Sequence, residues 1–423
     1  MNASRTHVIS LIARKSLAHH KLSTVVTALS LALAAGLVMS VFAIRSETYD
    51  AFTGGPAGFD AVLGARGSQL QLVLNTVFHL ETSPGNIPWE MYEAVKKDPN
   101  VALAVPYAVG DNYRGFRIVG TDEQLFTDLE YRKGKKFEVR PGGRVFDPRK
   151  KEAVVGSFAA QKTGLGVGSK FHPFHGLVYD ERMRHEDEYT VVGVMEPTNS
   201  PSDKVIWIPI DEFYRMSGHV LRGAGDVYTP VSGQEIPDKD KEVSAVMLKL
   251  KNPQAGFLLD QTINRQGKAA TLAWPIGKVM ADLFGKIGWV NDILTLVAYL
   301  VVLVAAGSVL ASIYNTMNER KREFAILRAL GAGRSTVFAA IIAEAASIAA
   351  IGTISGFLVY AAIMGGAAVI VREQTGVVLD PFRFEWVLVL TPAAMLLLGA
   401  VAGIIPAVKA YSTDVAANLA PAT

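Results

Sequence analysis

The chain of 423 residues contains no cysteine, which excludes disulfide bonds, thiolate metal sites and cysteine nucleophiles. It also lacks a strong excess of one charge, because 42 basic residues stand against 39 acidic ones and the formal net charge is only +3. So small an excess gives no reason to expect a nucleic-acid partner. Apolar sequence, in contrast, is abundant. Half of the residues are hydrophobic and the mean hydropathy is positive, which indicates membrane spans.

Four apolar runs, each with at most one charged residue, are long enough to cross a bilayer. The first run is too long for the apolar core of a signal peptide and has no small-residue cleavage site, so we expect it to remain as an anchor. The second is preceded by amphipathic sequence over Gly277–Asp292, which we expect to extend the helix out of the membrane as a stalk. The predicted transmembrane helices cover residues 22–44, 288–317, 335–371 and 386–408.

The short segments between the runs set the predicted topology, because Lys and Arg near span ends favour the cytoplasm. Residues 1–21 are basic and predict an amphipathic helix at the inner membrane surface, with Val8, Ile9, Ile12, Ala13 and Leu17 on one face. The basic loop 318–334 and the tail 409–423 are predicted to be cytoplasmic, and the loop 372–385 lies outside.

Charged residues, glycine, proline and aromatic side chains return over residues 45–287. We predict here a folded α+β domain of two lobes, inserted between transmembrane helices 1 and 2 and periplasmic by topology. Its positive charges do not oppose this location, since long domains are translocated largely regardless of charge. The predicted strands are Val101–Val105, Phe116–Val119, Ala153–Val155, Tyr189–Val194, Val205–Pro209 and Val243–Leu250, and the predicted helices are Pro88–Lys97, Ser157–Thr163 and Asp211–Met216.

The loop NERKREFAILRALGAGR at 318–334 carries a helical pattern. Phe324, Leu327 and Leu330 recur at a spacing of three, and Gly331 supplies a helix stop. The spacing predicts a short amphipathic helix at the cytoplasmic face. On spacing alone two interpretations stay open: a helix that lies on the lipid surface, or a helix that docks into a groove of a soluble partner.

Glu344 is an acid inside the third apolar run, and an ionisable group in such a run is a functional hypothesis. It follows Arg334 by about two to three helical turns, which places it near the inner interface. It is therefore placed to pair with a basic residue of the 318–334 loop or to face the helix bundle, and proton transport stays open as an alternative. Two G-x-x-x-G pairs, whose spacing allows close helix packing in lipid, are Gly352 with Gly356 and Gly399 with Gly403.

Histidine gathers in one stretch of the outer domain, where His172, His175 and His185 precede the acidic residues 186–188. Such a group is a candidate metal site. Pro173, however, argues against His172 and His175 sharing one helix face. We therefore expect a solvated loop and no metal site. No Ser-His-Asp or paired-carboxylate arrangement stands out, and we predict no catalytic residues in this chain.

Four segments follow the sequence pattern of one known family. Residues 319–332 resemble a cytoplasmic motif E-R-x-x-E-I-(A/G)-x-x-x-A-x-G-A, with Phe324 in place of the usual Ile. GAVAGIIPAVKA at 399–410 resembles a closing G-x-x-x-G-x-x-P-A-x-x-A, and residues 13–34 resemble the family's opening. EAVVGSFAAQKTGLGVGSKF at 152–171 resembles a strand–helix–glycine-turn segment of a periplasmic core domain. The chain thus resembles the MacB/FtsX-type, or type VII, ABC transporter permeases, well at its ends and in part over the outer domain.

The resemblance implies a permease subunit without its own motor. The chain agrees, since it has no G-x-x-x-x-G-K-[ST] phosphate loop, and the glycines of 164–170 stand in the wrong order. We expect no cofactor on this chain, with ATP and magnesium bound to a partner ATPase. We assign ATPase coupling to residues that match the motif or lie on the amphipathic helix: Glu319, Arg320, Glu323, Phe324, Leu327, Arg328, Leu330 and Gly331.

The leading hypothesis is a dimeric, multi-pass permease of the bacterial inner membrane that couples ATP hydrolysis on a cytoplasmic ABC ATPase to work in the periplasm. That work would be export or extraction of a lipid, lipoprotein, peptide or drug-like substrate by transmembrane conformational transmission. Expected partners are the ATPase, a second permease copy or homologous permease, a periplasmic adaptor or acceptor protein, and membrane lipid. The alternatives are a non-transporting regulator of a periplasmic enzyme such as a cell-wall hydrolase, and a membrane-anchored periplasmic enzyme.

Overall fold

The structure is a computed structural model that describes residues 2–54, 58–219 and 236–411. From residue 412 on, the predicted cytoplasmic tail lies outside the described residues. The chain divides into two compact units. A helical unit comprises residues 1–47, 287–368 and 380–423, and an α+β unit comprises residues 48–286 and 369–379.

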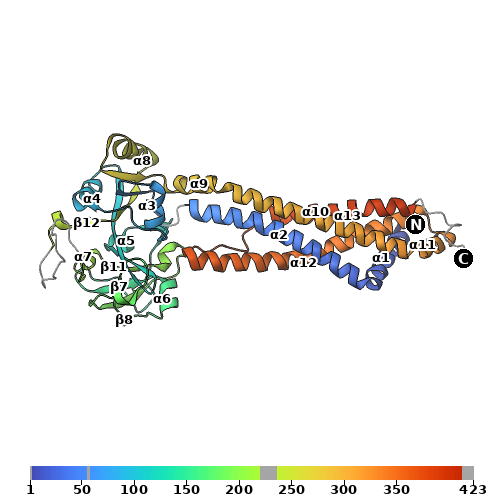
Figure 1. The fold of residues 1–423 in the computed structure, drawn as a ribbon, viewed down its shortest axis with the longest axis horizontal. Helices are drawn as coiled ribbons and strands as arrows, with labels where there is room; N and C mark the ends of the chain where they lie inside the picture. Colours follow the sequence, from blue (N-terminus) through green and yellow to red (C-terminus); the bar gives the residue numbers. More distant parts are fainter. Residues whose placement is uncertain (1, 55–57, 220–235, 412–423) are drawn as a thin grey trace. The chain divides into compact units, whose positions relative to one another are not determined.

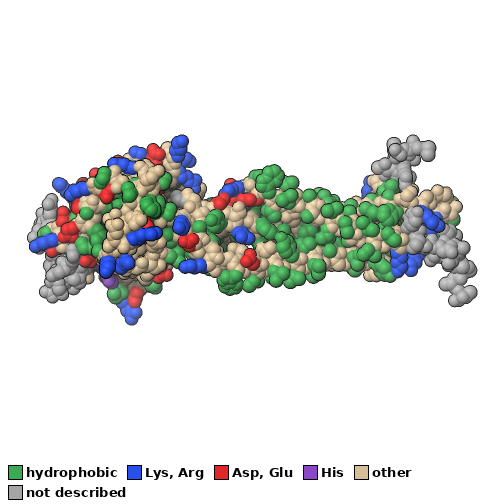
Figure 2. Space-filling model, turned by 90° about the horizontal axis from the view of Figure 1, so that it is seen from above, with side chains coloured by type: hydrophobic (Ala, Val, Ile, Leu, Met, Phe, Trp, Pro, Cys, Tyr) green, Lys and Arg blue, Asp and Glu red, His purple; other side chains and the backbone are tan. Residues whose placement is uncertain are grey.

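Within the described residues, four helices are long and apolar enough to cross a membrane, which confirms the four predicted spans. Figure 2 shows hydrophobic side chains spread over the surface of the helical unit, as expected for helices that face lipid. The four are α2 (Lys21–Thr53), α10 (Gly288–Glu319), α12 (Arg334–Thr375) and α13 (Val387–Tyr411).

Two of these helices are longer than the hydropathy pattern indicates. Helix α12 continues through the polar residues 372–375, which were predicted to begin an outer loop, and it ends where Gly376 adopts a φ of +77°. Helix α2 likewise continues past the predicted end at residue 44, to Thr53. Hydropathy marks where an apolar run ends, whereas Arg, Glu and Gln are good helix formers and let the helix continue.

The glycine pairs lie where helices of the helical unit cross. Gly352 and Gly356 of α12 approach α2 so closely that an added Cβ would lie 2.5 and 2.9 Å from α2 carbons. Gly399 and Gly403 of α13 approach α12 in the same way, at 2.4 and 2.8 Å. A larger side chain at any of these positions would push two backbones apart. The first helix, α1 (Asn2–His19), covers the predicted N-terminal segment and buries Ala13 and Ser16.

Ten strands of the described α+β unit form one mixed sheet, in the order β14–β1–β13–β3–β4–β11–β7–β10–β8, with β9 paired to β3. Figure 1 shows this unit with its strands and short helices. Strand β3 pairs with β13 along its first half and with β4 along its second half. Its register shifts between Val109 and Asp111, which marks a β-bulge in the second half. The strands are β1 (Ala61–Ala65), β3 (Val101–Tyr113), β4 (Phe116–Thr121), β7 (Glu152–Val155), β8 (Lys170–Phe171), β9 (Phe174–His175), β10 (Tyr189–Val194), β11 (Ile206–Pro209), β13 (Ala245–Leu250) and β14 (Ala270–Ala273).

Short helices and two small two-stranded sheets complete the α+β unit. Each predicted strand and helix of the domain is present, with Val243–Leu250 divided into β12 and β13. The fully buried Ile118, Tyr189 and Trp207 belong to predicted strands, so alternation of apolar residues identified part of the core. The remaining elements are β2 (Ile87–Pro88), β5 (Glu130–Arg132), β6 (Lys135–Lys136), β12 (Glu242–Val243), α3 (Gln69–Thr76), α4 (Trp89–Lys96), α5 (Gln124–Thr127), α6 (Ser157–Thr163), α7 (Ile210–Tyr214) and α8 (Pro253–Asp260).

The predicted stalk is divided into two helices. Helix α9 covers Ile276–Lys286, α10 begins at Gly288, and Ile287 lies between them with a non-helical ψ of 6°. Gly285 and Gly288 flank the break, and each glycine costs roughly 1 kcal/mol in a helix interior. The expectation of one continuous helix from the stalk into the second span is therefore wrong. The amphipathic pattern did not reveal the break because both sides keep helical periodicity.

Candidate coupling site and histidine cluster

The predicted amphipathic helix of the 318–334 loop is α11 (Lys321–Ala329), a separate helix between α10 and α12. Arg320 divides α10 from α11, with φ −100° and ψ 12°. At the other end Gly331 adopts a φ of +100°, and its N–H and that of the next residue donate to carbonyls of the last helical turn. This pair of bonds is a Schellman motif, which only a residue tolerant of positive φ completes cheaply.

The apolar side chains of α11 point in two directions. Phe324 is only 6% exposed and packs within its own chain, where the Arg320 guanidinium lies 5.0 Å from its ring centre. Leu330, in contrast, is 80% exposed and Ile326 is 44% exposed, while Leu327 is half-buried. Although Phe324 and Leu330 follow one helical spacing, they therefore do not form a single exposed apolar face. The side chains that α11 offers to a partner are Leu330, Ile326 and the outer edge of Leu327.

Glu344 joins three helices in what we call the inner polar cluster, composed of Ser16, Arg320 and Glu344. The Ser16 hydroxyl donates to Glu344 Oε1 at 2.6 Å and accepts from Arg320 Nη1, also at 2.6 Å. Arg320 Nη1 lies 3.6 Å from Glu344 Oε2, and both side chains are about nine-tenths buried, at 11% and 9% exposure. The cluster ties α1 and the start of α11 to α12.

The other charged residues assigned to coupling lie near the surface of α11. Glu323 is 60% exposed and accepts from Arg320 Nε at 2.9 Å. Glu319 is 66% exposed and lies 3.5 Å from His20. Arg328 is half-buried in the last turn of the helix. The cytoplasmic segment thus combines exposed apolar side chains, Leu330 and Ile326, with exposed charged ones.

The opposite end of α12 belongs to the α+β unit. The Lys204 ammonium donates to the carbonyls of Glu373 and Gln374 at 2.7 and 2.8 Å, where the last turn of the helix leaves its carbonyls free. Lys162 pairs with the Glu373 carboxylate at 2.5 Å, and Arg372 lies 5.3 Å from the Phe158 ring. Cations are favoured at a helix C-terminus, so this end of α12 is attached to the sheet unit by charge as well as by packing.

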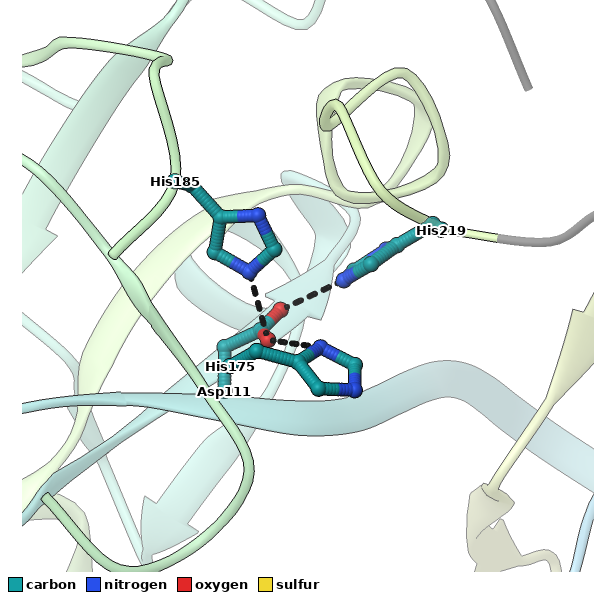
Figure 3. A group of neighbouring side chains, drawn as sticks. All are labelled: Asp111, His175, His185 and His219. Carbon is teal, nitrogen blue, oxygen red and sulfur yellow. Dashed lines mark hydrogen bonds and ion pairs between the residues drawn. The ribbon is translucent and has the colours of Figure 1, made fainter. Parts of the chain in front are cut away.

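A second group of polar side chains lies inside the α+β unit (Figure 3). The carboxylate of Asp111 is fully buried at the bulge of β3 and faces three imidazoles. His185 Nε2 lies 3.1 Å and His175 Nδ1 lies 3.3 Å from Asp111 Oδ1, while His219 Nε2 lies 3.1 Å from Oδ2. His175 stands on β9 directly opposite Asp111, and the other two histidines follow the 3-10 turn Glu181–Met183 and helix α7.

The prediction of a solvated loop is wrong for this group. His185 is 6% exposed, whereas the side chains of His219 and His175 are 11% and 48% exposed. His172 stays outside the group and places its Nδ1 3.0 Å from the carbonyl of Asp187. The sequence pattern missed Asp111 and His219 because they come from elements distant in the chain. A polar Asp inside the apolar run of β3 was the available signal.

The carboxylate of Asp111 stays ionised although it is buried. Burial alone would raise the pKa of Asp111, but hydrogen bonds from His175, His185 and His219 outweigh it and hold the pKa well below its usual value. For His185, burial lowers the pKa, while the hydrogen bond and charge of Asp111 raise it by more. The cluster is therefore an anionic carboxylate surrounded by imidazoles at neutral pH.

Comparison with known proteins gave matches to both parts of the chain. Residues 24–259 match the MacB-like periplasmic core domain, and residues 295–415 match the FtsX-like permease C-terminal domain. No curated protein sequence matches the chain. The extracellular domain of the noncanonic ABC-type transporter YknZ from Gram-positive bacteria is 16% identical with a TM-score of 0.28, over 50% of this chain and 99% of that chain. The periplasmic region of MacB from Actinobacillus actinomycetemcomitans is 10% identical with a TM-score of 0.33, over 55% of this chain and 95% of that chain.

Proposed function

Because the chain belongs to the MacB/FtsX-type family of ABC transporter permeases, we propose that it couples ATP hydrolysis by a separate cytoplasmic ATPase to work in the periplasm. Membership of the family and the four spans make it a multi-pass protein of the inner membrane, and the family implies a cytoplasmic ATPase partner. The work in this proposal is export or extraction of a lipid, lipoprotein, peptide or drug-like substrate. ATP and magnesium bind to the partner chain.

The observation that carries the proposal is the path of α12. It starts directly after the α11 segment, is tied to Arg320 by Glu344, and continues as one helix to Thr375. Its last turn is attached to the α+β unit by Lys204 and Lys162. A helix transmits displacement well because its hydrogen bonds are internal and it does not shorten cheaply. Movement of α11 by an ATPase is therefore passed along α12, and not along the second span alone, since that path is broken at Ile287.

A second permease copy is part of the proposal and is supported by the surface of α10. The buried side chains of this helix are Ala298 and then a series from Ala305 to Met317. Its first half carries exposed apolar side chains instead: Trp289, Ile293, Leu296, Leu300 and Leu303. In our proposal this surface packs against the same helix of the second copy, or of a homologous permease, and lipid covers the remainder.

The docking of α11 is tested by Leu330→Asp. This side chain is already exposed, so the substitution leaves the fold intact, but it would bury a charge in an apolar groove of the ATPase at a cost of several kcal/mol. We expect affinity for the ATPase, measured with purified components in nanodiscs, to fall at least tenfold. Leu330→Met, which keeps an apolar side chain, is the matched control and should bind as the wild type does. Equal affinity for all three proteins would instead favour a helix that lies on lipid.

A further inference from the structure

We propose that Asp111, His175, His185 and His219 form a binding site for a divalent cation of the zinc class in the α+β unit. The four side chains each offer one ligand atom, and these atoms all lie within 4.8 Å of one another (Figure 3). The site is independent of ATPase coupling, because none of the four residues takes part in the attachment of α12 or in α11.

The hydrogen bonds of the outer imidazole nitrogens decide which way the lone pairs point. His185 Nδ1 lies 2.7 Å from the carbonyl oxygen of Ser217, and His219 Nδ1 lies 2.9 Å from that of Phe213. A carbonyl oxygen only accepts, so both Nδ1 atoms carry the proton, and in the neutral imidazole Nε2 then carries a lone pair. Both Nε2 atoms face the Asp111 carboxylate. A carbonyl partner on the outer nitrogen is the usual support of a metal-bound histidine.

With the proton on Nδ1, His185 and His219 can donate a hydrogen bond to Asp111 only if each ring also carries a proton on Nε2 and is charged. The neutral rings instead turn a lone pair toward the carboxylate. His219 Nε2 and Asp111 Oδ2 are 3.1 Å apart, yet both atoms are buried without a hydrogen-bond partner among the described residues. Two unsatisfied buried acceptors in contact are unfavourable. A cation between them removes the repulsion and gives each atom a bond, which accounts for the geometry more simply than a hydrogen-bond network does.

The spacing and the donor set fit zinc. Zinc binds imidazole nitrogen and carboxylate oxygen at about 2.0–2.2 Å in tetrahedral geometry. The corresponding distance between two ligands is about 3.3 Å. From Asp111 Oδ1, His185 Nε2 lies at 3.1 Å and His175 Nδ1 at 3.3 Å, and His219 Nε2 lies 3.1 Å from the other oxygen, Oδ2. The imidazole rings surround the carboxylate almost evenly, with centroids 5.2 to 5.6 Å apart. Three nitrogens and one oxygen select zinc, cobalt, nickel or copper over calcium and magnesium, which prefer oxygen ligands.

An ion has access to the site from a pocket beside it. The pocket has a volume of about 330 Å³, and His175 and His219 lie in its wall together with Asp240 and Glu242. The two carboxyl groups make the pocket attractive to cations. His175 is the most exposed of the four ligands and is best placed to complete the coordination after an ion enters.

The four ligands come from four separate segments: the bulge of β3, strand β9, the loop after residue 183 and the segment after α7. An ion would therefore cross-link parts of the α+β unit that are far apart in the sequence. Binding to the folded state alone stabilises that state in proportion to the logarithm of ion concentration over Kd. At 100 times Kd, the expected rise in Tm is roughly 5–10 °C.

The test is metal binding by the full chain in nanodiscs after removal of metals with a chelator. We expect Zn²⁺ to bind with a stoichiometry of one per chain, measured by calorimetry and by elemental analysis after desalting, and to raise Tm. His185→Gln and Asp111→Asn should each lower the affinity at least tenfold. His219→Gln, at a half-buried ligand near the surface, provides a variant less prone to misfolding, and it should do the same while keeping the Tm of the metal-free protein. His172→Gln is the matched control and should bind as the wild type does.

X-ray absorption on the zinc-loaded protein provides a second, independent measurement. We expect only nitrogen and oxygen neighbours at about 2.0–2.2 Å, with the outer-shell scattering of imidazole rings reduced in His219→Gln. Absence of stoichiometric binding by the wild type would overturn the proposal and leave a hydrogen-bond cluster with at least one protonated imidazole. Binding that is unchanged in both His219→Gln and Asp111→Asn would also overturn it, since the ion would then lie elsewhere.

Discussion

Separating Arg320 from Glu344 should be among the most damaging changes to the helical unit. The two charged groups are 3.6 Å apart and about nine-tenths buried. At that distance their attraction is about 4.6 kcal/mol with an effective dielectric constant of 20. Removing one partner of a buried pair costs about 3–5 kcal/mol when the other charge is left uncompensated. Arg320→Met, which leaves Glu344 without its cation, should therefore lower the free energy of unfolding by about 3 kcal/mol. Glu344→Leu should cost less, about 2 kcal/mol, because Arg320 keeps its contact with Glu323.

The double variant distinguishes attraction from mere packing. If the loss comes from an unpaired charge, Arg320→Met combined with Glu344→Leu should lose far less than the sum, with a coupling energy of about 2–3 kcal/mol. Ser16→Ala is the control for the bridging hydroxyl and should cost only about 1 kcal/mol, since the two charges remain close.

The assay is equilibrium unfolding of the full chain in mixed micelles, followed by tryptophan fluorescence, together with ATPase affinity in nanodiscs. Each single variant should also weaken ATPase binding, because the start of α11 loses its attachment to α12. Strictly additive single and double variants would refute the reasoning, since they would show that Arg320 and Glu344 do not stabilise one another. Wild-type stability in Glu344→Leu would refute it as well.

Two further predictions concern topology and pH. A reporter that is active only outside the cytoplasm should work after Gly142 and fail after Arg334, and activity at Arg334 would overturn the four-span topology. Burial raises the pKa of Asp122 to about 6, despite the nearby Lys96. The unfolded chain, with an ordinary Asp pKa of about 3.9, releases this proton at lower pH than the folded protein does. Stability should therefore fall as pH rises from about 4 to 6, by at most about 3 kcal/mol. Asp122→Asn should remove this fall from the pH profile of thermal unfolding, and an identical profile in wild type and variant would contradict the pKa assignment.

Sequence patterns that act locally were sufficient for much of the fold. The four apolar runs, the strand Tyr189–Val194 and the helix Ser157–Thr163 are present at or near their predicted positions, because hydropathy and periodicity are properties of consecutive residues. The stop at Gly331 was predictable for the same reason, since a positive φ favours glycine. Helix ends beyond the apolar runs were not, because polar residues of high helix propensity carry no hydropathy signal.

Features that depend on distant residues could not be predicted in this way. Phe324 is buried because it packs beside Arg320 within the helical unit. Its spacing in the sequence was equally compatible with the buried face and the exposed face of α11. The histidine cluster depends on a bulge in β3 that turns Asp111 toward strand β9 and toward segments up to His219. The spacing of residues along the chain does not indicate that distant segments meet at one place. Pro173 was correctly interpreted as a helix breaker, but that argument excluded only a site on a helix and did not address a site built on strands and loops.

Coupling between ATP hydrolysis and the periplasmic side is the central claim, and cross-linking of α9 between two permease copies tests it most directly. The chain has no cysteine, so single cysteines at the exposed α9 positions Lys278, Asp282 and Lys286 report without background. A disulfide between copies requires Cα atoms within about 7 Å. We expect at least one position to cross-link, the bond to depress ATP turnover of the assembled complex, and reduction to restore it. Efficient cross-linking at these positions with unchanged ATP turnover would contradict the account, because hydrolysis would then proceed without movement of the periplasmic side.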